Sequence, residues 1–301
     1  MRYNSLEQYY IMKFNSKYPI VAMPMNGVSN VDLAIVVSRA GAVPSLSIFN
    51  YYTNGRVDLN LIENELKRFS DATGSSEIIL SMLWEHFMAA PVVDMLLRFN
   101  ISLVELFVRP ADQSEWLKLS THIDKMLVNG VCVMFKTTSR IPDSNFDALV
   151  LKGPLAAGRS FGGTWSLEKQ YDIVKEKVGS KIIPSGGIGN PEQVKYFMDR
   201  DALAIGIGTL LAASVESCVS ASTKEKIIES TSADIKLIGP LNCRGLLFSR
   251  LDGDDDNNSK SLHAGIQGTD SGCIYVGNGI DYIKEIMPVK DIIEWLVKDV
   301  N

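Results

Sequence analysis

Two glycine-rich junctions lie close together in the last third of the sequence, at residues 184–190 (PSGGIGN) and 204–209 (AIGIGT). In each, an apolar run typical of a buried strand ends in glycine and a helix begins. Glycine lets the main chain approach an anion closely, and N–H groups at helix starts favour negative charge. The pair therefore predicts a phosphate site where two neighbouring strands end. The alternative is that these glycines only form tight turns.

Short apolar runs alternate with helical segments before and between these junctions. The predicted strands are 19–23, 42–47, 77–83, 102–108, 131–135, 146–151, 181–184 and 203–206. The predicted helices are 31–40, 61–69, 91–99, 114–127, 166–178 and one that begins at Pro191. Asn30, Ser166 and Asn190 suit helix N-caps. Eight alternating strands imply parallel pairing and an α/β fold, a (β/α)8 TIM barrel, which usually takes about 250 residues.

The alternation is interrupted in two places. Only residues 136–145, with Pro142 among them, join the fifth and sixth strands, so we expect a turn there instead of a helix. After residue 222 the alternation fails, and the acidic run 252–258 is typical of an exposed loop. An amphipathic helix then follows at 288–297.

These interruptions predict a division of the chain into three parts. They are a barrel domain (1–222), a lid or small subdomain (223–272) and a C-terminal segment that packs back on the barrel (273–301).

Composition excludes several classes of partner. The chain has 301 residues, 46% of them hydrophobic, and a formal net charge of −5 without basic stripes, so we expect no nucleic-acid partner. No apolar stretch reaches the length of about 18 residues that a membrane span needs, and the four cysteines are far apart, as in reduced thiols. We therefore expect a soluble cytoplasmic protein without a membrane partner. The sequence leaves a homodimer open.

Few residues offer chemistry of their own. His86, His122 and His263 are scattered without metal-ligand spacing, so we expect no metal site. The sequence also lacks the GxSxG pattern of a nucleophilic serine. A bound cofactor is the better explanation, and the predicted phosphate could belong to a substrate or to flavin mononucleotide (FMN).

Several segments resemble a known family in the correct order. They are PIVAMPMNGVS (19–29), AIVVSRAGA (34–42), DALVLKG (147–153), SGGIG (185–189), GIGT (206–209) and YVGNG (275–279). Together they resemble the nitronate monooxygenase family and its relatives, the flavin-dependent enoyl-acyl-carrier-protein reductases. The resemblance covers most of the predicted barrel.

This resemblance implies FMN across the C-terminal mouth of the barrel. The positions that would contact it are Met23, Pro24, Met25, Ser81, Lys152, Gly158, Gly186, Gly187, Gly206, Ile207, Gly208 and Thr209. The glycine junctions would hold the phosphate, and residues 23–25 would pass along the flavin ring. A cation at Lys152 would favour a negatively charged oxygen of the cofactor. The alternative for Lys152 is a solvated or salt-bridged lysine.

The chain also departs from the family pattern. Lys152 stands where the family has glutamine, and Ser81 where it has asparagine. The family segment EAGGH reads LAAGR at 155–159, so Arg159 replaces a histidine that exchanges a proton with substrate in the family. Arginine stays protonated and cannot act as a base, but it can bind a carboxylate or a nitronate. We therefore predict Arg159 as the catalytic residue.

The resulting functional prediction is an FMN-dependent oxidoreductase of the nitronate monooxygenase type that acts on a small anionic substrate. One alternative is an enoyl reductase that takes electrons from NADH or NADPH and acts on acyl or polyketide thioesters, including carrier-protein-bound acyl chains. Others are a catalytically silent flavin binder and an unrelated barrel enzyme with a phosphorylated substrate. Tyr51, Tyr52, His86 and Lys136 follow strands and are further candidates for the mouth.

Overall fold

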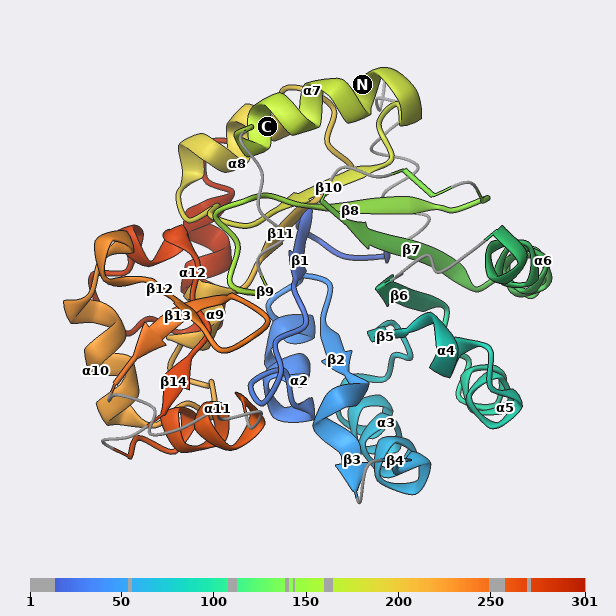
Figure 1. Cartoon of the computed structure of the whole chain (residues 1–301), viewed down its shortest axis with the longest axis horizontal. Helices are drawn as coiled ribbons and strands as arrows, with labels where there is room; N and C mark the ends of the chain where they lie inside the picture. Colours follow the sequence, from blue (N-terminus) through green and yellow to red (C-terminus); the bar gives the residue numbers. More distant parts are fainter. Residues whose placement is uncertain are drawn as a thin grey trace.

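The protein, seen in a computed structural model, has eight parallel strands at its centre (Figure 1). The residues described are 14–53, 56–107, 113–138, 141–142, 144–159, 165–248, 258–269 and 272–300. The strands are β1 (Ile20–Ala22), β2 (Ser45–Ser47), β5 (Ile79–Leu83), β6 (Leu103–Phe107), β7 (Cys132–Thr137), β8 (Ala148–Lys152), β10 (Ile182–Ser185) and β11 (Ile205–Ile207). Their order is β1-β11-β10-β8-β7-β6-β5-β2, and a parallel bridge from Val21 to Val43 brings the two ends together. The predicted TIM barrel is confirmed.

Helices surround these strands (Figure 1). They are α2 (Val31–Arg39), α3 (Leu59–Thr73), α4 (Trp84–Phe87), α5 (Ala90–Arg98), α6 (Gln113–Val128), α7 (Leu167–Val178), α8 (Pro191–Met198), α9 (Thr209–Ala212) and α12 (Val289–Leu296). The side chains of Asn30, Ser166 and Asn190 accept hydrogen bonds from the first turns of α2, α7 and α8, as predicted. The described residues between β7 and β8 contain no helix, in agreement with the predicted turn.

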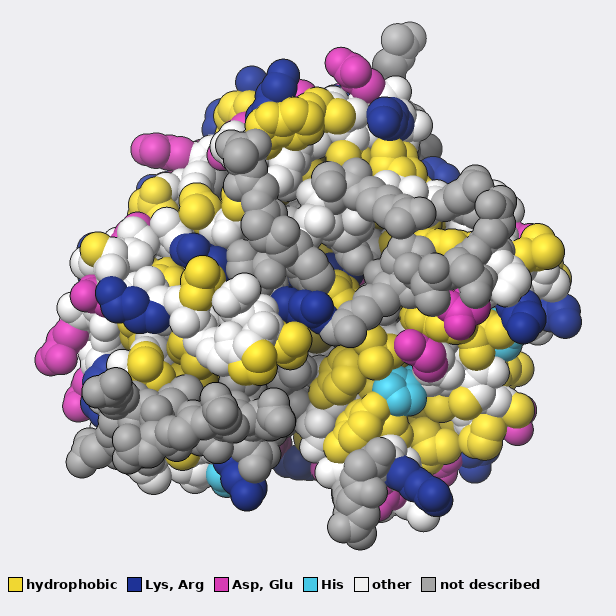
Figure 2. Space-filling view, viewed as in Figure 1, with side chains coloured by type: hydrophobic (Ala, Val, Ile, Leu, Met, Phe, Trp, Pro, Cys, Tyr) yellow, Lys and Arg dark blue, Asp and Glu magenta, His cyan; other side chains and the backbone are white. Residues whose placement is uncertain are grey.

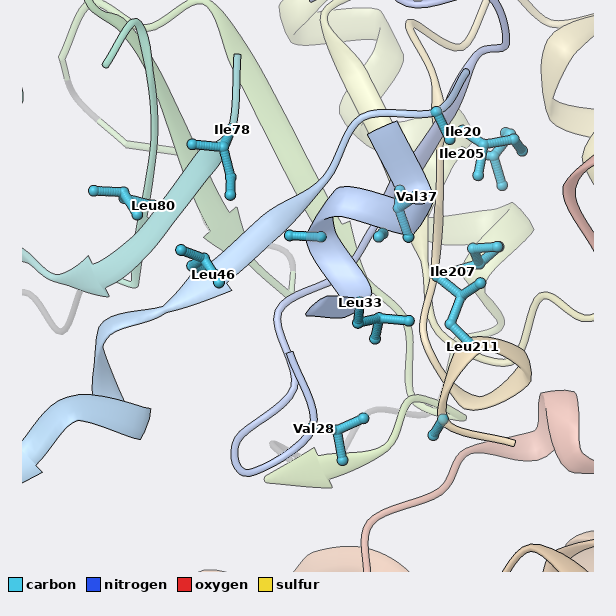
Figure 3. Close-up of a cluster of buried hydrophobic side chains, with 14 of the residues drawn as sticks. Ile20, Val28, Leu33, Val37, Leu46, Ile78, Leu80, Ile205, Ile207 and Leu211 are labelled. Carbon is cyan, nitrogen blue, oxygen red and sulfur yellow. The ribbon is translucent and has the colours of Figure 1, made fainter. Parts of the chain in front are cut away.

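Alternating side chains of the strands form two apolar layers. Inward positions such as Val21, Ile79 and Ile183 belong to a cluster inside the barrel. Outward positions pack against the helices. Figure 3 shows this outer layer, where Ile20, Ile205 and Ile207 lie near Leu33 and Val37 of α2. Both faces of each strand are therefore buried, as is usual in parallel sheets.

A second, antiparallel sheet lies to one side of the barrel (lower left in Figure 1). It contains β9 (Gly158–Arg159), β12 (Lys236–Ile238), β13 (Cys243–Leu247) and β14 (Cys273–Ile274), with α10 (Ala221–Glu229) and α11 (Asn258–Ile266) nearby. β9 comes from the loop after barrel strand β8, so the barrel itself contributes a strand to this sheet. The division at residues 222 and 272 stays a prediction. Residues 252–257 of the predicted acidic loop lie outside the described residues.

Smaller elements complete the chain. A hairpin of β3 (Tyr52–Thr53) and β4 (Arg56–Val57) follows a 3-10 turn at η1 (Ile48–Tyr51). Two further 3-10 turns are η2 (Ser232–Asp234) and η3 (Asn278–Tyr282). Among the helices described, none is both long enough and apolar enough to cross a membrane.

Candidate cofactor and substrate site

Polar side chains gather inside the barrel at the C-terminal ends of its strands. All but Ser47 stand two residues after apolar inward positions, so strand alternation also points them inward; Ser47 stands four residues after the inward Val43. Neighbours in the strand register include Ser81 beside Glu105 and Lys152 beside Ser185. This polar layer comprises Ser47, Ser81, Glu105, Lys136, Lys152 and Ser185. The barrel therefore has an apolar floor and a polar mouth.

The carboxylate of Glu105 is the most deeply buried charge of this layer, with 1% of the residue exposed. The Ser81 hydroxyl donates to its Oε1 atom at 2.8 Å, and Lys136 Nζ lies 2.7 Å from the same oxygen. Both contacts are made across neighbouring strands. Glu105 was not predicted as a site residue, although it is the single charge in the apolar run 103–107. That pattern was the available signal, because a lone inward carboxylate needs a partner.

Lys152 ends β8 next to this pair. Its Nζ donates to the backbone carbonyl of Arg159 at 2.8 Å, so it is held within the site. Burial, and after it the nearby charge of Lys136, lower the pKa of Lys152 from its ordinary value to about 8. Lys152 is therefore held against the segment that carries Arg159, and its place in the cofactor site stays a prediction.

Arg159, the predicted catalytic residue, lies on β9 and is half-buried. Its backbone is fixed from two sides, by Lys152 and by pairing with Cys243 of β13. On the face seen in Figure 2, the surface is hollowed near its centre, and Lys and Arg side chains lie at the hollow. β9 and β13 lie to the left of this centre in Figure 1. The segment that carries Arg159 thus connects the barrel to the second sheet.

The first glycine junction packs tightly against the segment before β9. Gly186 and Gly187 have φ angles of +101° and +84°, which favour glycine. A Cβ on Gly186 would lie 2.5 Å from the Cβ of Ala156, and one on Gly187 would lie 2.9 Å from the Cβ of Leu155. Both glycines are therefore required by the fold, whatever they bind.

The second junction has the properties that a phosphate needs. A Cβ on Gly208 would meet only Met25, with Sδ at 3.4 Å, so there is room beside it. Within the described part of the chain, no group accepts a hydrogen bond from the backbone N–H of Gly208 or Thr209, and the same is true of Gly187 in the first junction. Amides at the mouth with no protein acceptor among the described residues suit the phosphate of FMN, so the residues present fit that cofactor.

Two more contacts join the predicted cofactor positions. Met23 donates its N–H to the carbonyl of Ile207 at 2.8 Å, and its Sδ would overlap a Cβ placed on Gly206. The loop of residues 23–25 therefore lies directly on the second glycine junction. The hydroxyl of Thr209 accepts a hydrogen bond from the N–H of Gly277 at 3.0 Å. The sequence had not predicted this contact, which brings the YVGNG segment into the site.

Three aromatic candidates lie after β2 and β5. The Tyr52 hydroxyl and His86 Nε2 are 2.5 Å apart, and Phe49 stacks on Tyr52. Burial lowers the pKa of His86. Tyr51 is half-buried against α3, and burial raises its pKa. Tyr52 and His86 therefore interact with each other, whereas Lys136 is the one of these candidates that joins the polar layer.

Comparisons with known proteins agree with this architecture. A family model described as nitronate monooxygenase matches residues 121–299. The chain is 22% identical to a probable nitronate monooxygenase of Bacillus subtilis (strain 168), covering 96% of this chain and 98% of that protein. Among solved structures, FabK of Thermotoga maritima is similar with a TM-score of 0.77 and 22% identity, covering 96% and 94% of the two chains. A nitroalkane oxidase of Streptomyces ansochromogenes is similar with a TM-score of 0.74 and 18% identity, covering 97% of each chain. These two structural matches show the fold alone.

Proposed function

The chain belongs to the nitronate monooxygenase family, whose members are FMN-dependent oxidoreductases, and we propose that it oxidises a small anionic substrate. The observation that carries the proposal is the cationic mouth of the barrel, with Lys136, Lys152 and Arg159. Lys136 pairs with Glu105 at 2.7 Å. We expect the substrate anion beside Lys152 and Arg159, because a guanidinium can bind two oxygens at once.

The proposed cofactor site uses both glycine junctions. The N–H groups of Gly187, Gly208 and Thr209 would hold the phosphate of FMN, and Met23 and Met25 would pass along its ring. The remaining positions proposed to contact it are Pro24, Ser81, Lys152, Gly158, Gly186, Gly206 and Ile207. Bound FMN supplies a two-electron acceptor, which the protein side chains cannot supply themselves.

The protein's own residues bind and orient the substrate in this proposal. Arg159 holds the anionic group and stays charged throughout, because its guanidinium does not lose a proton at physiological pH. The backbone carbonyl of Arg159 accepts a hydrogen bond from Lys152 Nζ, so the lysine at the end of β8 is held next to the segment that carries Arg159. Positive charge fixed in advance stabilises negative charge that develops during the reaction.

An absorption spectrum of the protein as purified, followed by additions without oxygen, tests the function. A flavin spectrum that bleaches with an alkyl nitronate alone supports the proposal. Bleaching only with NADH or NADPH would instead support an enoyl reductase. A flavin inert to both would support a silent binder, and a colourless protein that takes up no FMN would refute the assignment.

Substitution at Gly208 tests where the phosphate lies. We expect Gly208→Asp to lose retained FMN because it puts a carboxylate where the phosphate should rest. Gly208→Ala is the matched control, since its Cβ would lie 3.4 Å from Met25 Sδ, an ordinary contact. Flavin content is measured by absorbance after gel filtration, and folding by far-UV circular dichroism. Equal flavin content in the folded Asp variant and the Ala variant would contradict the placement.

A further inference from the structure

Arg244 of β13 is a second arginine in the strand pair that carries Arg159. β9 and β13 are antiparallel, with Arg159 opposite Cys243 and Gly158 opposite Arg244. Opposed residues share a face of a sheet and successive residues alternate between faces, so Arg159 and Arg244 project from opposite faces of the pair. The Cys243 thiol and Lys152 interact electrostatically, which places the face with Arg159 toward the mouth. Arg244 therefore lies on the face turned away from the mouth.

The half-buried guanidinium of Arg244 is held by a neutral side chain. Its Nη2 atom donates to Oδ1 of Asn278 at 2.5 Å. Among the described residues, no carboxylate pairs with Arg244 and no group accepts a hydrogen bond from its buried Nε atom. Burial lowers the pKa of Arg244, although an arginine stays protonated at physiological pH. A partly buried cation without a counter-ion costs free energy, so stability does not explain this arginine.

Asn278 belongs to the YVGNG segment, which lies between the predicted phosphate site and the segment that leads into β9. The backbone N–H of Asn278 donates to the carbonyl of Leu155 at 3.0 Å, and the N–H of Gly277 donates to the Thr209 hydroxyl at 3.0 Å. A Cβ on Gly277 would lie 2.6 Å from the carbonyl oxygen of Leu155, so the two segments pack directly on each other. Leu155 begins the LAAGR stretch that ends at Arg159.

We propose that Arg244 is a positioning residue for Arg159, which holds the β9–β13 pair on the YVGNG segment so that the Arg159 guanidinium is fixed where the substrate anion binds. The inference rests on the proposed function, in which Arg159 binds that anion. The Arg244–Asn278 bond fixes the face of the strand pair turned away from the mouth. The bond from Asn278 to Leu155 fixes the start of the segment that carries Arg159. A binding group that is held in advance loses less conformational freedom when the ligand arrives.

Arg244→Met tests this role, because methionine keeps a long unbranched side chain but donates no hydrogen bond. We expect KM for ethyl nitronate to rise about 10-fold to 100-fold with a much smaller change in kcat, since a displacement of about 1 Å can cost about 100-fold. Retained flavin and the midpoint of urea unfolding should stay near their wild-type values, because the lost cation had no counter-ion among the described residues. A lower midpoint with an unchanged KM would mean that Arg244 only stabilises the fold.

Asn278→Ala removes the acceptor of the same bond but keeps the backbone N–H that bonds to Leu155. It should raise KM by a similar factor, and the double variant should raise it no further, because both substitutions remove one interaction. Arg98→Met is the matched control, since Arg98 lies on α5 with its side chain 59% exposed and pairs with Glu63 at 2.5 Å. It should leave KM unchanged. Losses that add in the double variant, or an unchanged KM in Arg244→Met, would overturn the inference.

Hydrogen exchange measured by mass spectrometry tests the same contact without turnover. The peptide that contains residues 155–159 should exchange at least about tenfold faster in Arg244→Met than in the wild type, because a hydrogen bond from a charged group contributes that much. Arg98→Met should leave its exchange unchanged. If the wild-type protein oxidises no nitronate, the proposed function fails on its own, and faster exchange would still show that Arg244 holds this segment. Exchange at the wild-type rate in Arg244→Met would overturn the inference.

Discussion

The buried pair of Glu105 and Lys136 allows a quantitative test of the polar layer. Removing one partner of a buried ion pair costs about 3–5 kcal/mol, because the other charge is left uncompensated. Lys136→Met leaves a carboxylate on a residue that is 1% exposed, and the Ser81 hydroxyl still donates a hydrogen bond to it. The free energy of unfolding should therefore fall by about 4–5 kcal/mol, at the upper end of the range for a broken buried ion pair.

The opposite substitution should cost less. Glu105→Leu leaves Lys136, whose side chain is 16% exposed and can reach water at the mouth. We expect a loss of about 3 kcal/mol. The double variant replaces the pair with apolar side chains, so it should lie within about 2 kcal/mol of the wild type. The two single losses are therefore not additive.

Urea unfolding followed by far-UV circular dichroism gives the free energy of unfolding of the wild type, the two single variants and the double variant. An exposed pair provides the control: Lys195 and Asp199 are 2.9 Å apart with side chains 44% and 56% exposed. Their double-mutant cycle should give a coupling below about 1 kcal/mol. Additive losses at Glu105 and Lys136, or single losses under about 1 kcal/mol, would refute the argument from burial.

Three further outcomes are expected. Arg159→Ala should raise KM for an anionic substrate far more than it lowers the amount of bound flavin, and equal losses would show that its role is wrongly assigned. Asn190→Ala should destabilise the protein by about 1 kcal/mol in urea, because it removes the N-cap of α8; no loss would mean that the cap is redundant. Burial and Lys136 hold the pKa of Lys152 at about 8, so its charging opposes folding below that pH. The unfolded chain then binds more protons between about 8 and 10.5, and the free energy of unfolding should rise with pH across that window relative to Lys152→Met. A difference in the free energy of unfolding between the wild type and Lys152→Met that does not change with pH would contradict this prediction.

The sequence was sufficient for the barrel because its signals are local. Strands buried on both faces are short continuous apolar runs, and Asn30, Ser166 and Asn190 make their capping bonds within three residues. β9 could not be predicted in this way. It has two residues, too few for any periodic pattern, and its partner Cys243 lies 84 positions after Arg159 (243 − 159).

The candidate site was predicted only in part for the same reason. Motif resemblance identified loop positions such as Gly208 and Met25, which the structure brings into contact. Glu105 was missed because its partners Ser81 and Lys136 lie 24 and 31 residues away on neighbouring strands. The assignment of each residue to cofactor or substrate stays a prediction.

If Arg159 binds the substrate as proposed, the antiparallel pairing of β9 with β13 lets residues outside the barrel alter substrate preference. The strand that carries Arg159 rests on residues outside the eight-stranded barrel, in the stretch from β12 to β13. Sequence changes there can tilt or shift the guanidinium while every strand of the barrel keeps its register. Libraries aimed at new substrates should therefore randomise residues 236–247 before altering the mouth itself.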